Sequence, residues 1–203
     1  MTEPIITIVD DDDAVRDSLA LLLNFRGFRC RGYASAEACL KAWDPGWRGC
    51  LLLDLRMSGM DGLGLQRALA ERGSRLPVVF LTGHGDIAHA RAALKAGAVD
   101  FLEKPYAEDA LLEAVREAVA RDTRQHAEHR YSEEIAARMA RLSERERQVM
   151  DLAVAGKPNR EIAALLEISP RTVEVFKARM MEKMQARSLP ELVRMAMESR
   201  TGA

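Results

Sequence analysis

The chain lacks several features that would assign it to particular protein classes. It has no apolar stretch long enough to cross a bilayer, and its N-terminus has no basic region followed by a long apolar core. Its 3 cysteines (Cys30, Cys39 and Cys50) show no Cys-x-x-Cys spacing, which disfavours a metal or dithiol site. We therefore expect a cytoplasmic protein with no membrane partner, in which the cysteines are ordinary packing residues.

A strong excess of charge is also missing. The 203 residues include 30 Lys and Arg and 31 Asp and Glu, for a formal net charge of −1. The charges are nevertheless unevenly distributed, because residues 1–122 hold 15 basic and 19 acidic side chains whereas residues 123–203 hold 15 and 12. An acidic first part and a mildly basic second part indicate two domains with different partners.

The first part contains a repeated pattern in which a short apolar run ends in polar residues. Four runs have this form: Ile5–Val9 before Asp10, Cys50–Leu53 before Asp54, Val78–Leu81 before Thr82, and Val99–Leu102 before Glu103 and Lys104. A fifth apolar segment is Phe28–Tyr33. Helical patterns occur at Ala14–Arg26, Ala34–Trp43, Gly62–Arg72, Ile87–Ala96 and Glu108–Ala120. This alternation predicts an α/β fold with a doubly wound, five-stranded parallel sheet.

The polar ends of these runs predict a reactive crevice. Parallel strands end at one edge of their sheet, so Asp10, Asp11 and Asp54 should meet the Thr82 hydroxyl and the Lys104 ammonium there. Three carboxylates repel one another unless a cation lies between them, and Mg²⁺, with Mn²⁺ as second choice, suits oxygen ligands. A carboxylate beside such an ion can attack a phosphoryl donor and form an acyl phosphate, whose added charge Lys104 would offset.

The motifs at these strand ends resemble the receiver domain of two-component response regulators, a flavodoxin-like fold. The matching segments are Val9–Asp11, Leu53–Met57, Leu81–Gly85 and Phe101–Pro105, and the resemblance covers residues 4–120. It implies that Asp54 accepts a phosphoryl group from the histidine of a sensor kinase, with Mg²⁺ held by Asp10, Asp11 and Asp54.

The resemblance also implies a switch and shows one departure. Thr82 and Lys104 would sense the phosphorylated state while the ring of Phe101 turns inward. The family loop after the acceptor usually reads Met-Pro-x-Met-x-Gly, but Ser58 stands at the proline position here. Because proline would fix φ and serine does not, we expect a more mobile loop and faster loss of the phosphoryl group. His84 is expected to be a solvated loop residue.

Residues 122–141 predict a connector between a receiver domain at 1–121 and a second domain at 142–203. The segment has no Gly or Pro and little apolar content, and it places Glu134 and Arg138 at i,i+4 spacing. We expect a charged, semi-rigid helical linker.

Capping signals predict four helices in the second domain. Ser143 and Glu146 form a capping-box pattern, Asn159 is a candidate N-cap, Ser169-Pro170 opens a helix at Pro170–Met184, and a second box at Ser188–Glu191 opens Leu189–Glu198. The turn between the second and third helices is short enough for a helix-turn-helix. We therefore expect a small all-α domain.

The helix at Pro170–Met184 has one apolar stripe and one exposed face. Val173, Phe176, Met180 and Met184 make up the stripe. The candidate DNA-binding residues are Arg171, Thr172, Glu174, Val175, Lys177, Ala178 and Arg179. In a major groove, arginine can bind guanine, glutamate can accept from cytosine N4, and small apolar residues can contact thymine methyl groups. The weak positive charge of this part leaves an ordinary helical bundle open as an alternative.

Three further segments resemble the LuxR-type helix-turn-helix: Leu142–Glu146, Gly156–Ala163 and Ile168–Glu174. The whole chain then resembles the FixJ-type regulators of the NarL/FixJ class. This implies a non-enzymatic, phosphorylation-dependent transcriptional regulator, expected to be an activator, that dimerises and binds double-stranded DNA after phosphorylation by a sensor histidine kinase. Its only catalysis would be slow autodephosphorylation.

Two other functions are alternatives for these residues. One is a Mg²⁺-dependent phosphohydrolase with Asp54 as nucleophile, but Arg56 stands where haloacid dehalogenase enzymes carry a second aspartate as general acid. The other is a phosphorylation-gated module that binds protein or RNA.

Overall fold

The computed structural model describes residues 3–83 and 97–201, and the chain divides into two compact units, Met1–Gln125 and His126–Ala203. The first unit contains strands β1 (Ile5–Val9), β2 (Arg29–Tyr33), β3 (Gly49–Asp54), β4 (Val78–Thr82) and β5 (Asp100–Glu103). They form one parallel sheet in the order β2-β1-β3-β4-β5. The predicted five-stranded, doubly wound sheet is therefore confirmed.

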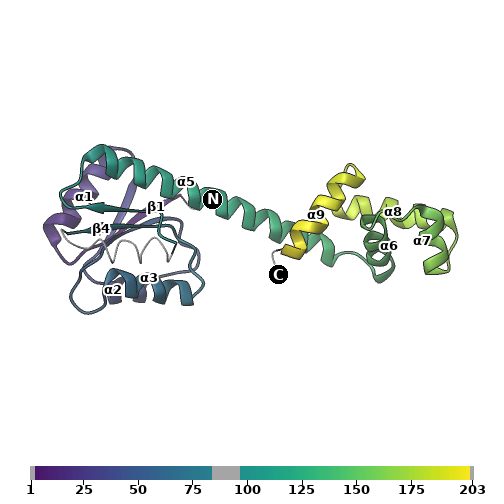
Figure 1. Ribbon diagram of the computed structural model, residues 1–203, viewed down its shortest axis with the longest axis horizontal. Coiled ribbons are helices and arrows are strands. Elements are labelled where there is room, and N and C mark those ends of the chain that lie inside the picture. The colour runs from purple at the N-terminus through teal and green to yellow at the C-terminus, as the bar shows by residue number, and fades with distance from the viewer. Residues whose placement is uncertain (1–2, 84–96, 202–203) are drawn as a thin grey trace. The chain divides into compact units, whose positions relative to one another are not determined.

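Helices cover both faces of the sheet (Figure 1). On one face, alternate residues such as Ile8 and Leu52 pack against α1 (Asp13–Phe25) and the start of α5 (Glu108–Ala140). On the other face, residues such as Leu53 and Phe80 pack near α2 (Ala36–Ala42) and α3 (Gly62–Glu71). Because successive strand residues face opposite ways, every position of β3 and β4 is buried, and this accounts for their continuous apolar runs.

The helix predicted at Ile87–Ala96 and the predicted loop residue His84 lie outside the described residues. The three cysteines are free thiols whose pKa values are raised by burial, to about 11 for Cys30 and Cys39. Thiols with raised pKa values remain protonated at neutral pH and are poor nucleophiles.

Helix α5 takes part in both units. Its first half buries residues such as Leu111 and Val115 against the sheet, and its second half buries Ile135 in a core of the second unit. Within the first unit, Asp122 accepts from Arg48 at 2.9 Å, with side chains only 9% and 12% exposed. The first compact unit extends to Gln125, within the segment 122–141 that the sequence predicts as the linker.

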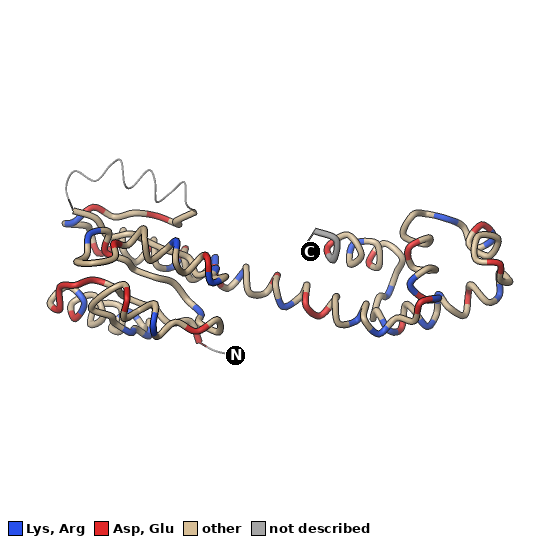
Figure 2. The backbone as a smooth tube through the Cα atoms, turned by 90° about the horizontal axis from the view of Figure 1, so that it is seen from below, with Lys and Arg blue, Asp and Glu red and all other residues tan. Residues whose placement is uncertain are grey.

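The second unit completes its fold with α6 (Glu144–Val154), α7 (Asn159–Leu166), α8 (Pro170–Met184) and α9 (Leu189–Thr201). Basic and acidic residues are interspersed along these helices (Figure 2). Buried residues such as Val149, Ile162 and Val173 form one core, and Ile135, Met180 and Leu192 belong to another. The predicted all-α helix-turn-helix unit is confirmed.

The predicted helix caps have mixed outcomes. The Ser143–Glu146 capping box is formed, and Ser169 caps α8 with Pro170 at its first turn. The prediction that Asn159 caps α7 is wrong, because Pro158 is the N-cap and makes no side-chain bond. Asn159 is instead the first helical residue, and its Oδ1 accepts from Lys177 Nζ at 3.1 Å.

The capping box predicted at Ser188–Glu191 forms with one partner changed. Ser188 Oγ accepts from the N–H of Glu191 at 3.4 Å, as in a capping box. The Glu191 carboxylate, however, accepts from the N–H of Arg187 at 2.8 Å rather than from that of Ser188. The two bonds therefore enclose one more residue than the pattern predicts.

Candidate functional site

The carboxyl ends of β1, β3, β4 and β5 bring the predicted polar residues together. Asp10 follows β1, Asp54 ends β3, Thr82 ends β4 and Lys104 follows β5. Lys104 Nζ donates to Asp10 Oδ2 at 2.8 Å and to Asp54 Oδ1 at 2.7 Å. The parallel sheet thus joins residues that are 94 and 50 positions apart in the sequence.

Burial and pairing set the ionisation of this group. Asp54 is only 7% exposed, and this burial raises the pKa of its carboxyl despite the opposing effect of Lys104. Burial lowers the pKa of Lys104, but bonds to Asp10 and Asp54 outweigh it and raise the pKa above its usual value. Lys104 therefore remains an ammonium group that offsets part of the negative charge of the two aspartates.

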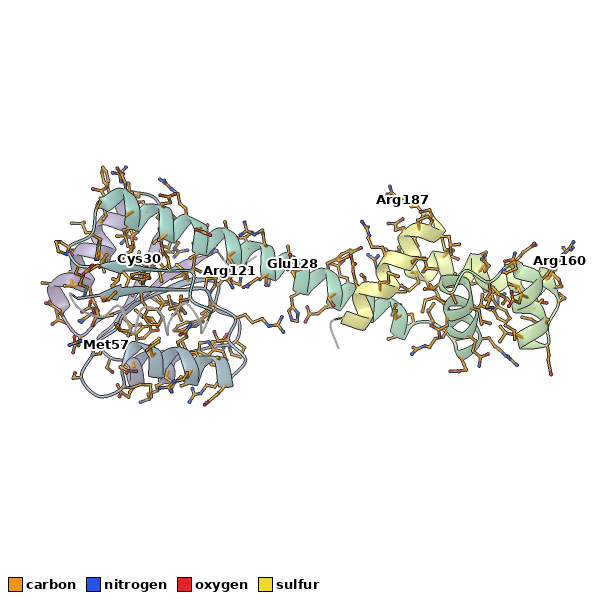
Figure 3. The ribbon with its side chains drawn as sticks, viewed as in Figure 1. Cys30, Met57, Arg121, Glu128, Arg160 and Arg187 are labelled. Atoms are coloured by element: carbon orange, nitrogen blue, oxygen red, sulfur yellow. The ribbon has the colours of Figure 1, made fainter. Side chains whose placement is uncertain are left out.

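The third acid, Asp11, has a different hydrogen-bond partner, although the charge of Lys104 also acts on it. Its side chain is exposed, and its Oδ2 accepts from the backbone N–H of Ser58 at 2.9 Å. This bond is the main reason that the pKa of Asp11 lies below its usual value. Asp11 therefore contacts the loop between β3 and α3, which contains Met57 (labelled in Figure 3).

The donor set suits a hard divalent cation. Among the residues that the structure describes, no three His, Cys, Asp or Glu side chains are grouped closely enough to hold a metal ion. Asp10, Asp11 and Asp54 nevertheless offer carboxylate oxygens at one edge of the sheet, the ligand type that Mg²⁺ prefers together with water. Binding would exchange part of the present pairing with Lys104 for pairing with the ion.

The two remaining residues predicted at the crevice, Thr82 and Phe101, differ in burial. Thr82 is 3% exposed, and its hydroxyl donates to the backbone oxygen of Gly83 at 2.9 Å. Phe101 pairs with Phe80 in the register of β4 and β5, and the residue is 37% exposed. The threonine hydroxyl is thus occupied by the backbone while the aromatic ring lies at the surface.

Sequence reasoning missed two residues of this region. Glu37 Oε1 accepts from the N–H of Met60 at 2.9 Å, so α2 holds the loop from a second side. Tyr106 is half-buried against the core that the sheet forms with α1 and α5. Burial raises the pKa of its hydroxyl, and the charge of Lys104 opposes that effect. A lone glutamate in a helix and a tyrosine after a proline carry no sequence signal for these contacts.

The second unit presents most of the predicted DNA-binding residues on α8. Arg171, Glu174, Val175, Ala178 and Arg179 are exposed. Thr172 is partly buried, and its hydroxyl lies 2.7 Å from that of Ser169. Lys177 reaches Asn159 on α7 and is likewise partly buried.

An ion pair between a buried carboxylate and a partly exposed lysine joins α8 to α6. Lys183 Nζ donates to Glu146 Oε2 at 2.6 Å, and the Glu146 side chain is 4% exposed. Glu146 Oε2 also accepts from the N–H of Ser143 at 2.7 Å. The bond to Lys183, followed by the one to Ser143, holds the pKa of Glu146 below its usual value. Phe176 packs with the Val149 core, so its position on the inward stripe is confirmed.

Two protein families match the chain. The response regulator receiver domain matches residues 6–116, and the bacterial regulatory proteins of the luxR family match residues 140–196. The transcriptional regulatory protein FixJ of Azorhizobium caulinodans is 48% identical over 192 residues, covering 95% of this chain and 91% of that protein. FixJ of Rhizobium meliloti is 48% identical over 198 residues, covering 97% of each chain.

The chain belongs to the FixJ-type response regulators. The solved structure of the response regulator StyR matches it with a TM-score of 0.88 at 36% identity, covering 97% of this chain and 100% of that one. Full-length FixJ from B. japonicum matches with a TM-score of 0.60 at 44% identity, covering 99% of each chain.

Membership of this family establishes the general function. The FixJ-type chain is a phosphorylation-dependent transcriptional regulator of a two-component system, with a receiver unit and a LuxR-type DNA-binding unit. The family implies a histidine kinase partner and DNA as a ligand, and receiver domains generally use Mg²⁺. A phosphohydrolase is not favoured. No helix within the described ranges has both the length and the apolarity required to cross a membrane.

Proposed function

We propose that Asp54 is the phosphoryl acceptor. Its contact with Lys104 at 2.7 Å, beside Asp10 at the same ammonium group, carries this proposal. An oxygen of the Asp54 carboxylate would attack the phosphorus of a kinase phosphohistidine as the phosphorus–nitrogen bond breaks. The leaving imidazole would take up a proton, and the product would be an acyl phosphate.

The surrounding residues have distinct proposed roles. Asp10, Asp11 and Asp54 would hold Mg²⁺, or Mn²⁺ in its place, and the ion would supply charge neutralisation at the transferring group. Lys104 would pair with the new phosphoryl oxygens. For Thr82 to donate to one of them, its hydroxyl must leave the oxygen of Gly83, and the exposed ring of Phe101 would then move inward.

The output would be duplex DNA binding by α8, coupled to homodimerisation. Arg171, Glu174 and Val175 are exposed near the start of this helix, where a recognition helix contacts base edges. Ala178 and Arg179 continue this face, and the partly buried Thr172 and Lys177 would contribute from its sides. Two DNA-binding units in a dimer would contact two half-sites, and effective concentration would then raise the affinity. The proposed result of binding is activation.

The functional division we propose assigns input to residues 1–121 and output to residues 142–203, with residues 122–141 as connector. Apart from slow autodephosphorylation, the chain would have no catalytic activity of its own, and it would act in the cytoplasm.

The acceptor assignment can be tested with a small phosphodonor. Incubation of the full chain with donor and Mg²⁺ should add one phosphoryl group, detected by intact mass, whereas Asp54→Asn should add none. Asp17→Asn is the matched control, because Asp17 is exposed on α1, away from the crevice. Full phosphorylation of Asp54→Asn would refute the assignment.

A further inference from the structure

Each of the three crevice aspartates accepts one backbone N–H, but the donors differ in origin. Asp10 Oδ1 accepts from Asp12 at 3.0 Å, and Asp54 Oδ2 accepts from Arg56 at 3.0 Å. These two donors lie 2 positions after their acceptors, so each strand end orients its own carboxylate. The donor to Asp11 is Ser58, which is 47 positions away in the sequence.

The orientation of Asp11 therefore depends on the loop between β3 and α3. This loop is held at Ser58 by Asp11 and at Met60 by Glu37, with both N···O distances at 2.9 Å. Gly59 lies between these anchors with a φ of +81°, and a Cβ there would come within 2.8 Å of Glu37 Oε1. The loop backbone is thus shaped so that two nearby N–H groups reach carboxylates on different elements.

The donor to Asp11 exists because residue 58 is not proline. Serine has a backbone N–H, whereas proline has none and could not make this bond. Asp11 is exposed, and the Ser58 N–H is the strongest of the few contacts that act on its carboxylate, ahead of the Ser58 hydroxyl. A carboxylate that accepts one N–H at Oδ2 still has a second oxygen for a cation.

We propose that the backbone N–H of Ser58 is a positioning group that orients Asp11 for Mg²⁺ and links the β3–α3 loop to metal binding. The inference rests on the proposed Mg²⁺ site. Hydrogen-bond partners of metal-binding carboxylates orient them, and their removal commonly weakens metal binding about 10–100-fold. Ser58 would act through Asp11 and would not contact the ion.

Metal binding by full-length variants tests this role. Mn²⁺ binding would be measured by electron paramagnetic resonance of the free ion, with Mg²⁺ as competitor. Ser58→Pro should bind about tenfold more weakly than wild type. Ser58→Ala retains the N–H but loses the hydroxyl, which also hydrogen-bonds the Asp11 carboxylate, and should therefore lose much less affinity than Ser58→Pro. Glu37→Ala releases the loop at Met60 without touching Asp11, and should have a much smaller effect than Ser58→Pro.

A second measurement does not depend on the folding of the proline variant. In wild type, the Ser58 amide proton should be protected from exchange, and Asp11→Ala should remove that protection. An unprotected Ser58 amide in wild type would overturn the proposal, as would equal affinities for Ser58→Pro and wild type. If Ser58→Pro and Glu37→Ala lost Mn²⁺ affinity equally, the proposal would also be overturned, because the general order of the loop would then explain the loss. If wild type bound neither ion, the proposed Mg²⁺ site itself would fail.

Discussion

At the scale of single residues, the main feature of the crevice is which donor binds each aspartate. Lys104 joins Asp10 and Asp54, whereas Ser58 holds Asp11 through the backbone. A second buried pair, Arg48 and Asp122, holds α5 to the first unit in the same way. Charged groups buried this deeply are costly when they lose a partner.

Asp122→Ala should destabilise the first unit by about 3–5 kcal/mol, because it leaves the guanidinium of Arg48 buried without its carboxylate. Denaturant unfolding followed by tryptophan fluorescence isolates this unit, since Trp43 and Trp47 are the only 2 tryptophans of the chain. Glu117→Ala, at an exposed position of α5, should leave the denaturant concentration at the unfolding midpoint nearly unchanged. A small effect of Asp122→Ala would show that solvent reaches the pair.

Ser58 also bears on how long the phosphoryl group persists. Ser58→Pro should lengthen the half-life of the phosphorylated full chain by at least about twofold, because proline has no N–H to orient Asp11 and weaker Mg²⁺ binding would slow loss of the phosphoryl group. Loss of label from phosphorylated full chain, in the presence of Mg²⁺, measures this. Equal half-lives for the two proteins would contradict the prediction.

At the scale of helices, the pair of Lys183 and Glu146 determines how α8 is held by α6. Glu146 also completes the capping box of α6, so one carboxylate closes the start of one helix and anchors another. This arrangement fixes the exposed face of α8 without using any of the predicted DNA-binding side chains.

Glu146→Gln should destabilise the second unit by about 1–3 kcal/mol, since a buried charge-assisted bond is lost. The folded pKa of Glu146 lies below its usual value of 4.5, so its stabilising contribution is present above that pH and is lost as the pH falls through the folded pKa. Amide hydrogen exchange of Val149 and Met180 between pH 3 and 6 measures this loss: protection should fall toward low pH in wild type and less so in Glu146→Gln. Glu144→Gln, exposed in the same first turn, is the control.

On α8, Arg171→Ala should weaken binding to specific DNA by about 1–3 kcal/mol, or roughly fivefold to 150-fold, and relax base preference at one position. Arg124→Ala, an exposed arginine in the first unit, should change affinity little. Fluorescence anisotropy at fixed salt measures both. If both substitutions reduced affinity equally, nonspecific charge would explain the binding.

At the scale of the whole molecule, input and output lie in separate units. The acceptor crevice is formed entirely by the first unit and the exposed face of α8 entirely by the second. Phosphorylation at the proposed acceptor, Asp54, therefore has to change the association of the chain, or the availability of its second unit, to affect DNA binding.

Wild type treated with phosphodonor and Mg²⁺ should sediment as a dimer and protect two half-sites in a DNA footprint. Asp54→Asn should remain monomeric and protect DNA only at higher concentration. Analytical ultracentrifugation and footprinting with and without donor provide the measurements. A dimeric Asp54→Asn in the presence of donor would count against phosphorylation at this residue as the trigger.

Much of this architecture was predictable from local patterns in the sequence. The apolar runs of β3 and β4 predicted buried parallel strands, and the Ser143 and Ser169 caps predicted two helix starts, because these features depend on near neighbours. Strand ends of a parallel sheet share one edge, so the meeting of Asp10, Asp54 and Lys104 also followed from the order of elements.

The tertiary structure decided the contacts that no local pattern encodes. Asn159 looked like an N-cap, but a lysine on α8 offered its side chain another partner. The loop at Ser58 was expected to be freer than one with proline, yet carboxylates from two distant segments accept its N–H groups. The sequence alone determined the residue types, the elements and their order. Only the folded chain decided which donor meets which acceptor, because hydrogen bonds between distant segments depend on distances set by packing.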